Sequence, residues 1–348
     1  MTILKRLRFI ALVLMAYIVL ILLIFFVESG NENANIKSIF DAIWYSLVTL
    51  TTVGYGDFYP VTVAGKIIGL IFLLGSLGLL GLLIGEIADK TNEFRESKKM
   101  GFRGTNFSDH IIIIGWDDFA HSVTLQLVSV GRRVAIVTDR KDDIDVIYEE
   151  FGKKNVFVLF ADLKNAVLLA KVNIKKSRMI FVNLQEDADK LITILNIKKH
   201  YASRNFLVTL ESADLKDTFQ SAGVTYVISK AEIAAKMTAS YIFEPDVADF
   251  ANALLSSVKG EFEYDFQQFK VTRSNPYLNR TYGEIFNDLK QMHNIVLVGI
   301  RKGSNGQELI KLPEDSTKIE LGDYLIMILN SHTEKIVSEI FRVKEGIT

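Results

Sequence analysis

Seven residues between two long uncharged apolar runs restrict the possible folds more than any other feature of the sequence. Residues 51–57 read TTVGYGD, so that glycine alternates with larger residues near the end of the stretch. Glycine adopts backbone angles that other residues resist, which allows successive carbonyl groups to turn the same way. A glycine-rich turn after a helix is the simpler interpretation. Irregular backbone at membrane depth, however, is tolerated only where it is buried in protein or lines a water-filled path.

The flanking runs are long enough to cross a membrane. The first, Phe9 to Val27, has nineteen residues, which just span a hydrocarbon core of about 30 Å. The second, Ile67 to Gly85, also carries no charge. Basic residues at positions 5, 6 and 8 predict a cytoplasmic N-terminus. A signal peptide is disfavoured because the cleavage site around Glu28 is poor and a second apolar run follows.

A short helix is predicted between the two crossings. Glu28 to Asn35 is expected to form a polar outer loop, and Ser38 with Asp41 predicts a helix N-terminus of the capping-box type. The helix would end at Leu50 after about 13 residues, which is too short to span a membrane. We therefore expect it to re-enter and lead directly into residues 51–57. Its C-terminus carries partial negative charge, which favours a cation on the helix axis.

The segment resembles the selectivity filter of tetrameric potassium channels. The residues that match its five-residue core are Thr52, Val53, Gly54, Tyr55 and Gly56, and Asp57 matches the acid that usually follows. The resemblance implies that potassium ions bind the backbone oxygens of Thr52, Val53, Gly54 and Tyr55. It also implies that Asp57 braces the filter, with a solvated carboxylate at the pore mouth as the alternative. Trp44 and Tyr45 either support the filter or lie at the membrane interface.

Glycines recur along the second crossing, at positions 69, 75, 78, 81 and 85. One interpretation is helix packing, because small residues let membrane helices approach closely. The other is a bend that opens the pore, and the resemblance places that hinge at Gly75 or Gly78. Two crossings cannot enclose a pore. A filter built from one loop per chain therefore implies a homotetramer.

Composition separates a membrane part from a water-soluble part. Hydrophobic residues make up 49% of the 348 residues, with the apolar excess in the first quarter and the charges concentrated after it. The formal net charge of −1 gives no basic face for nucleic acid, so no nucleic-acid partner is expected. The chain has no cysteine, which excludes disulfides and thiolate metal sites.

Strand and helix patterns alternate after residue 108. The expected strands are 110–114, 133–138, 155–160, 179–183, 205–210 and 225–228, and the expected helices are 120–129, 143–151, 164–170, 188–200 and 215–222. This alternation predicts a parallel sheet covered by helices on both faces. Such a doubly wound sheet binds ligands at the carboxyl ends of its strands.

The end of the first strand partly matches a dinucleotide-binding fingerprint. Residues 115–120 read GWDDFA, so Gly115 is present but Asp117 and Ala120 replace the other two glycines. In favour of a nucleotide such as NAD or ADP, Asp139 follows the second strand at about the offset of an acid that bonds ribose hydroxyls. The alternative is that Asp139 caps the next turn. The complete candidate site is Gly115, Trp116, Asp117, Asp139, Asp162 and Asn183.

The soluble part resembles the regulator-of-potassium-conductance (RCK) domain. The resemblance is carried by the first strand with Gly115-Trp116, by residues 181–184 (FVNL) and by residues 222–229 (AGVTYVIS), in this order behind a two-crossing pore. It implies a cytosolic ring of four or eight such domains. Some relatives bind calcium at positions that match Asn183, Thr209 and Glu211, of which only Glu211 is an acid, so calcium activation at that site is doubtful. Other acids, including Asp187, are expected on solvated helix faces.

The expected architecture is multi-domain. An α-helical two-transmembrane pore domain (1–90) and a linker (91–108) with a hydrated second half precede a Rossmann-like α/β lobe (109–230). A crossover helix-turn-helix (231–259), whose second helix covers 246–258, then leads to a smaller α+β lobe (260–348). In that lobe we expect a hairpin around residues 303–306, a strand to Leu329 and a closing helix from Ser331 to Arg342.

These features predict a ligand-gated potassium channel of the cell membrane, with its N-terminus and its RCK domain in the cytoplasm. The ligand would be a nucleotide or, alternatively, calcium with the Rossmann-like lobe as a scaffold. A membrane-anchored NAD-dependent enzyme is the remote alternative, because no catalytic arrangement stands out and an anchor needs no filter. A potassium-uptake subunit is disfavoured because those carry several pore loops in one chain.

Overall fold

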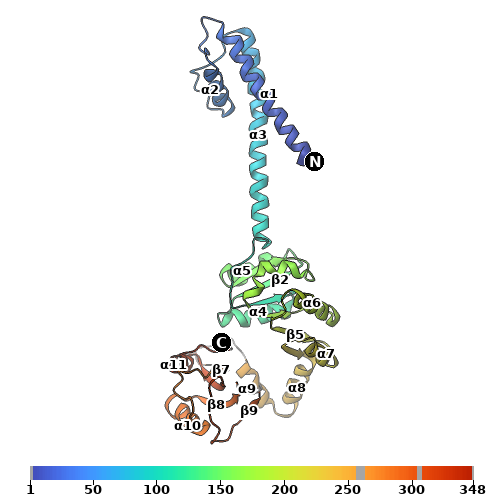
Figure 1. Cartoon of the computed structure of the whole chain (residues 1–348), viewed down its shortest axis with the longest axis vertical. Helices are drawn as coiled ribbons and strands as arrows, with labels where there is room; N and C mark the ends of the chain where they lie inside the picture. The colour runs from blue at the N-terminus through green and yellow to red at the C-terminus, as the bar shows by residue number, and fades with distance from the viewer. Residues whose placement is uncertain (1–2, 256–262, 304–307, 347–348) are drawn as a thin grey trace. The chain divides into compact units, whose positions relative to one another are not determined.

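The computed structural model describes residues 3–255, 263–303 and 308–346, and it divides into two compact units, Met1–Ser97 and Lys98–Thr348. Figure 1 shows the elements of both units, and each unit is described here by itself. The first unit holds α1 (Ile3–Ser29), α2 (Ile39–Leu50) and most of α3 (Val63–Lys99). Among the described residues, α1 and α3 are long and apolar enough to cross a membrane, whereas α2 is too short.

The predicted start of the short helix is confirmed. The Ser38 side chain accepts from the Asp41 amide while Asp41 accepts from the Ser38 amide, which closes a reciprocal capping box. The three helices of the unit share a small apolar cluster, whose buried members are Ile21, Ile24, Ile36, Ala42 and Phe72. This cluster fixes α2 beside α1 and α3, and so it positions the segment that follows α2.

The predicted outer loop begins later than expected. Glu28 belongs to the last turn of α1 and is 0% exposed, so it is not part of a solvated loop. Its carboxylate bonds the chain just before α3, a contact that links residues more than thirty positions apart. Its charge alone predicts a place in the solvated loop, and that prediction is wrong.

The predicted linker also differs from expectation in its second half. As expected, its first half extends the inner helix, which continues to Lys99. Beyond it, Met100 is only 7% exposed, and its carbonyl accepts from the Phe160 amide at 3.0 Å. The Thr105 amide donates to the Lys171 carbonyl at 2.9 Å. The segment is therefore anchored to the lobe that follows it and is not a hydrated tether.

The predicted doubly wound sheet is confirmed. The strands are β1 (His110–Ile114), β2 (Val134–Thr138), β3 (Val156–Phe160), β4 (Ser177–Val182), β5 (Phe206–Leu210) and β6 (Tyr226–Ser229). All pairs are parallel, and the spatial order is β3-β2-β1-β4-β5-β6. This is the strand order of dinucleotide-binding folds, with the change of direction between β1 and β4.

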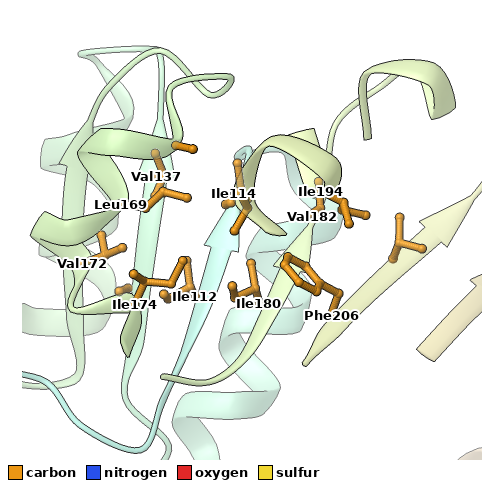
Figure 2. Packing of buried hydrophobic residues seen from close by; sticks show 14 of the residues in the cluster. Ile112, Ile114, Val137, Leu169, Val172, Ile174, Ile180, Val182, Ile194 and Phe206 are labelled. Atoms are coloured by element: carbon orange, nitrogen blue, oxygen red, sulfur yellow. The ribbon is translucent and has the colours of Figure 1, made fainter. Parts of the chain in front are cut away.

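Side chains of alternate residues build a core on each face of this sheet. Figure 2 shows Ile112, Val182 and Phe206 gathered with Leu169 and Val172 on one face. That face is covered by α6 (Asp187–His200) and α7 (Lys216–Ser221). The helix expected over 164–170 is instead the 3-10 helix η1 (Ala166–Val172). Asn165 caps it, and Asn173 ends it in the left-handed conformation, which leaves little length for an α-helix.

The opposite face is covered over only part of its width. α4 (Asp118–Ser129) and α5 (Asp143–Asn155), which is interrupted at Gly152, pack on β1, β2 and β3. After β6, α8 (Lys230–Phe243) and α9 (Pro245–Leu255) form the predicted helix-turn-helix, although residues 256–258 of its expected second helix lie outside the described residues. The Glu244-Pro245 break falls between the two helices, as proline geometry requires.

The smaller lobe is α+β, as expected. Its antiparallel sheet has the order β7-β10-β8-β9, with β7 (Tyr264–Lys270), β8 (Val296–Arg301), β9 (Leu309–Lys311) and β10 (Tyr324–Asn330). The predicted pairing of 296–302 with 308–312 is confirmed by β8 and β9, while the turn residues 304–306 lie outside the described residues. Two helices pack on this sheet, α10 (Tyr282–His293) and α11 (Ser331–Phe341).

A buried histidine at the start of β1 makes the stability of the soluble part sensitive to acid. Burial lowers the pKa of His110, and the nearby Arg133 lowers it further, although a hydrogen bond with the Val172 carbonyl opposes the shift. Because the unfolded chain takes up a proton first, stability is lost as pH falls below about 6.5. We expect the melting temperature of the purified channel to fall as the pH is lowered from 7.5 to 5.5. Each kcal/mol of lost unfolding free energy should lower it by about 3 °C. His110→Gln should flatten this pH dependence, and equal slopes for both proteins would contradict the assignment.

Candidate functional site

The segment after α2 has an alternating backbone. Thr52, Gly54 and Gly56 have positive φ angles of 59°, 59° and 75°, whereas Val53 and Tyr55 do not. The amides of Val53 and Gly54 both donate to the Val48 carbonyl, at 3.1 and 3.3 Å, which ties the segment to the end of α2. Sequence reasoning anticipated the two glycines. It did not anticipate Thr52, because a residue with a branched side chain rarely adopts a positive φ and does so only where its surroundings enforce it.

Aromatic and acidic side chains surround this segment. Trp44 donates through Nε1 to Asp57 Oδ2 at 2.8 Å, and its ring stacks with that of Tyr55 at a centroid distance of 6.4 Å and an interplanar angle of 8°. Three of the predicted residues therefore meet: Trp44 from α2, and Tyr55 and Asp57 from the segment itself. Tyr45 lies elsewhere, with its ring 6.2 Å from Phe72 of α3.

The two glycines proposed as a hinge lie within an unbroken helix. α3 runs through Gly75 and Gly78 as one continuous helix, Val63–Lys99. A Cβ added at either position would meet no atom within 4 Å. Packing within one chain therefore does not require glycine at these positions.

At the carboxyl edge of the parallel sheet, β1 and β4 end in close contact. Gly115 has φ 96°, and a Cβ there would overlap the Asn183 carbonyl, so only glycine fits. Asp117 caps α4 by accepting from the Ala120 amide at 2.8 Å, and the Asn183 side-chain amide donates to the same carboxylate oxygen at 2.6 Å. The helix N-terminus that would receive a pyrophosphate is thus occupied in part by the chain's own anion.

The other predicted edge residues differ in their freedom to bind a ligand. Asp139 is exposed and makes no hydrogen bond to another described residue. It does not cap the following turn, because Thr138 and Asp143 close that turn with a hydroxyl–carboxylate bond of 2.8 Å. Asp162 accepts from the Lys164 amide at 3.0 Å and so stabilises its own loop. Trp116 is half-buried with its ring edge against Phe151.

The positions that match the calcium ligands of relatives are engaged elsewhere. Glu211 pairs with Lys230 at 3.0 Å, and Thr209 is 3% exposed. Within the described ranges, no group of three or more histidine, aspartate or glutamate side chains is arranged to hold a metal ion. The arrangement therefore offers no preformed carboxylate cage at this edge.

Asp187 differs from its expected place on a solvated face. Its carboxylate accepts from the buried Lys190 at 2.7 Å and from the amides of Glu211 and Ser212. Burial alone would raise the pKa of Asp187, but these hydrogen bonds outweigh burial and lower it. The contact joins the loops after β4 and β5, which the sequence could not reveal because the partners are 24 and 25 residues apart.

Two family models match the chain in sequence order. One, described as "Ion channel", matches residues 11–93, and the other, described as "TrkA-N domain", matches residues 111–230. The first covers the helices that could cross a membrane and the segment after α2. The second covers the six-stranded parallel sheet up to the start of α8.

Similar proteins include channels from prokaryotes and eukaryotes. The calcium-gated potassium channel TvoK of Thermoplasma volcanium is 27% identical in an alignment 338 positions long that covers 92% of this chain and 92% of that one. The human SLO3 gating ring shares the fold, with a TM-score of 0.51 and 13% identity over 67% of this chain and 46% of that one. The GsuK channel bound to NAD aligns with a TM-score of 0.43 and 16% identity over 97% of this chain and 59% of that one. The chain thus spans about three fifths of that channel's length.

Proposed function

The chain belongs to the prokaryotic potassium channels that carry an RCK domain behind the pore, and from this premise we propose that four copies conduct potassium under control of a cytosolic ligand. It is a channel subunit rather than an enzyme. The observation that carries the proposal is the alternation of positive φ at Thr52, Gly54 and Gly56. Such alternation lets successive carbonyls face one axis, where they replace the hydration shell of the ion.

A single chain supplies one quarter of the proposed pore. Val53 and Tyr55 are 53% and 69% exposed in one copy, although they follow an apolar helix in a membrane protein. Four copies around one axis would cover these side chains and place four sets of carbonyl oxygens in rings. The C-terminus of α2 would then direct its partial negative charge toward the ion path.

The aromatic contacts supply a brace for the filter in this proposal. Trp44 holds Asp57 and stacks on Tyr55, so the chain on both sides of Gly56 is tied to α2. Tyr45 supports the filter indirectly, because its ring packs α2 against α3. Gly75 and Gly78 remain the proposed hinge, since glycine in a helix interior lowers the cost of bending.

The protein is a membrane protein, and we place its N-terminus and its RCK domain in the cytoplasm. The bases at positions 5, 6 and 8 support this orientation, since cytoplasmic segments carry an excess of Lys and Arg. α1 and α3 cross the membrane while α2 re-enters, so both ends of the pore domain lie on one side. The lipid bilayer and further copies of the chain are the partners that this arrangement requires.

Self-association of the soluble part is supported by an uncovered apolar surface. α8 has no buried residue, and Ile242 and Phe243 near its end are 74% and 83% exposed. Beside it, a groove of about 500 Å³ crosses the uncovered part of the sheet and is lined by apolar side chains, including Phe119, Phe181 and Ile233. Exposed apolar patches of this kind mark protein interfaces. We propose that pairs of RCK domains close this surface within a ring of four or eight domains.

The proposed ligand is an adenine nucleotide such as NAD or ADP. The strand order, the close approach at Gly115 and the free carboxylate of Asp139 support this choice. Asp117 opposes it, because its charge lies at the helix N-terminus that phosphates would approach. A ligand gates the pore only if it binds one ring conformation more tightly than the other.

Two substitutions test the nucleotide assignment. Asp139→Ala should weaken nucleotide binding to the purified channel by about 10- to 100-fold, because a charge-assisted hydrogen bond to ribose is lost. Asp117→Asn keeps the helix cap but removes the negative charge, so binding should tighten by roughly tenfold. Calorimetric titration and open probability in planar bilayers would measure both effects. Unchanged binding in both variants would exclude this edge as the nucleotide site.

Calcium is the second candidate ligand, favoured by the similarity to a relative named as calcium-gated. It would act with the Rossmann-like lobe as a scaffold, and Glu211 is the one acid at the matching positions. The same bilayer recordings separate the two candidates when calcium and nucleotide are added in turn. Activation by calcium alone, insensitive to Asp139→Ala, would replace the nucleotide proposal.

A further inference from the structure

A completely buried lysine lies at the carboxyl edge of the parallel sheet. Lys190 is near the start of α6, and its side chain is 0% exposed. Lysine is almost never fully buried unless it is paired. Its ammonium donates to Asp187 Oδ1 at 2.7 Å, and the Asp187 side chain is only 11% exposed. Both charges therefore lie below the surface, where either one would be costly without the other.

The carboxylate of this pair joins two loops of the sheet edge. Asp187 is the first residue of α6 and so follows the loop after β4. Its Oδ2 accepts from the amides of Glu211 and Ser212, at 3.2 Å each, and both of these residues lie in the loop after β5. Amides alone would leave the carboxylate with a full negative charge, which the Lys190 ammonium neutralises. Lys190 thus allows a buried carboxylate to connect the two loops.

The loop after β5 extends this contact to α8. Glu211, whose amide bonds Asp187, pairs through its own carboxylate with Lys230 at 3.0 Å. Lys230 is the first residue of α8, and its ammonium lies over the ring of Phe119, 4.8 Å from the ring centroid. Phe119 belongs to the first turn of α4, which Asp117 caps at the proposed nucleotide site. A series of contacts therefore leads from α6 through the β5 loop to α8 and to the start of α4.

The buried pair is the part of this series that solvent does not weaken. The side chains of Glu211 and Lys230 are 62% and 32% exposed, and exposed ion pairs contribute little because water and salt screen them. Because Asp187 bonds the Glu211 amide, the buried pair fixes the backbone from which the Glu211 side chain reaches Lys230. Loss of the Lys190 ammonium would therefore act on α8 through the backbone of the β5 loop.

We propose that Lys190 is a positioning residue that supplies a built-in cation to the sheet edge and thereby connects this edge to α8. The inference rests on the proposed function, because it concerns how a ligand at this edge changes the rest of the RCK domain. A cation attached to the chain is present at all times, so Asp187 needs no ion from solution. Without the ammonium, Asp187 would turn toward water, and the β5 loop would no longer hold Lys230 at the start of α8.

Chemical rescue of the full-length channel tests the need for a cation. Lys190→Ala removes the atoms that make up n-propylammonium. The variant should melt roughly 6 °C or more below the unmodified channel, because one charge of a buried pair is left alone. Its open probability should no longer follow NAD or ADP. Added n-propylammonium should restore both properties in part, since it stabilises the folded protein to which it binds.

Three controls separate charge from other effects of the amine. Neutral 1-propanol fills the same space without a charge and should restore neither property; equal rescue by the amine and the alcohol would overturn the proposal. The unmodified channel in n-propylammonium measures any effect of the amine on the pore. Lys164→Ala is the matched variant, because Lys164 pairs with Asp189 at 2.8 Å but its side chain is 53% exposed. It should behave as the unmodified channel.

Two further variants keep the test decisive. In a Lys190→Ala, Asp187→Asn double variant, n-propylammonium should have no effect, and rescue that persists would contradict the pairing. Lys190→Met keeps most of the buried volume and removes the charge, so it serves if Lys190→Ala fails to assemble. A normal response of Lys190→Met to NAD or ADP would refute only the role of Lys190. No response of the unmodified channel to either nucleotide would instead refute the proposed nucleotide control, while rescue of the melting temperature would still test the built-in cation.

Discussion

Replacing Gly54 or Gly56 by alanine is expected to abolish potassium-selective current while the tetramer still assembles. Both glycines have positive φ, and a left-handed conformation costs an L-residue with a side chain about 1–2 kcal/mol. The four filters of a channel share the same rings of oxygens, so the strain sums to roughly 4–8 kcal/mol per tetramer. Relief of that strain would turn carbonyls away from the axis, and potassium would lose the oxygens that replace its water shell.

The effect is predicted to come from the backbone and not from a clash within one chain. An added Cβ at Gly54 or Gly56 would meet no atom within 4 Å. Gly30 offers a matched control, because its surroundings are equally open and its φ is not positive. Gly30→Ala should therefore leave selectivity and current unchanged.

The measurement combines reversal potentials in mixed potassium and sodium with the mass of the purified assembly. Loss of selective current in both filter variants, with an intact tetramer, is the expected result. Potassium-selective current that survives both substitutions would show that ions do not pass through rings made by residues 52–56. Loss of the tetramer would instead assign the glycines to assembly.

The sequence predicts well those features of this protein that depend on residues close together in the chain. The capping box at Ser38 and Asp41 depends on one turn of helix, and it forms as predicted. The doubly wound parallel sheet follows from the regular alternation of apolar runs with helical patterns, because parallel strands joined by helices have few permitted arrangements. The left-handed glycines of the filter are likewise a local property of TVGYG.

The parts that sequence predicts poorly depend on contacts between distant residues. The sequence predicts a solvated loop for Glu28, because a charge after an apolar run normally faces water, yet its partners lie 33 and 34 residues away. The sequence likewise predicts a solvated helix face for Asp187, because an acid in an amphipathic helix normally faces water. Thr52 carries no sign of its positive φ, since glycine is the residue that usually signals it. Charge and propensity describe single residues, whereas these features belong to pairs.

Segment 98–105, which begins in the last turn of the inner helix, is the clearest case of a contact that the sequence does not reveal. Gly101 has φ 79°, and a Cβ there would overlap the Val158 carbonyl and lie 2.9 Å from Leu159 Cα. Both atoms belong to β3, whose backbone is fixed by pairing with β2. Gly101→Ala must therefore displace the segment and not the strand.

Displacement removes the anchor at Met100, the residue before Gly101. Met100 would leave its buried position, a loss of about 2 kcal/mol, and its carbonyl would lose the bond from Phe160, about 1 kcal/mol more. The left-handed backbone adds about 1–2 kcal/mol of strain for alanine. The chain runs directly from α3 through this segment to the RCK domain, so a loose anchor should uncouple the two.

Gly101→Ala is thus expected to leave unitary conductance and potassium selectivity unchanged while open probability no longer follows the effector. NAD, ADP and calcium, added in turn to the cytosolic side, are the effectors to compare. Gly131→Ala is the matched control, because Gly131 has a similar φ of 74° but open space around its Cβ. It carries the same backbone strain without displacing any anchor. An unchanged effector response in Gly101→Ala would show that coupling does not pass through this contact.

A second readout of the same variant needs no effector. Lys99 and Arg103 flank the anchored residues, and cleavage by trypsin at these sites requires the segment to open locally. Since cleavage follows the population of the open form, a loss of about 3 kcal/mol should speed it by roughly a hundredfold. Gly131→Ala should cleave at the original rate. Equal cleavage rates of both variants would mean that the anchor contributes little stability. The prediction that Gly101→Ala uncouples the pore from the effector would then be wrong.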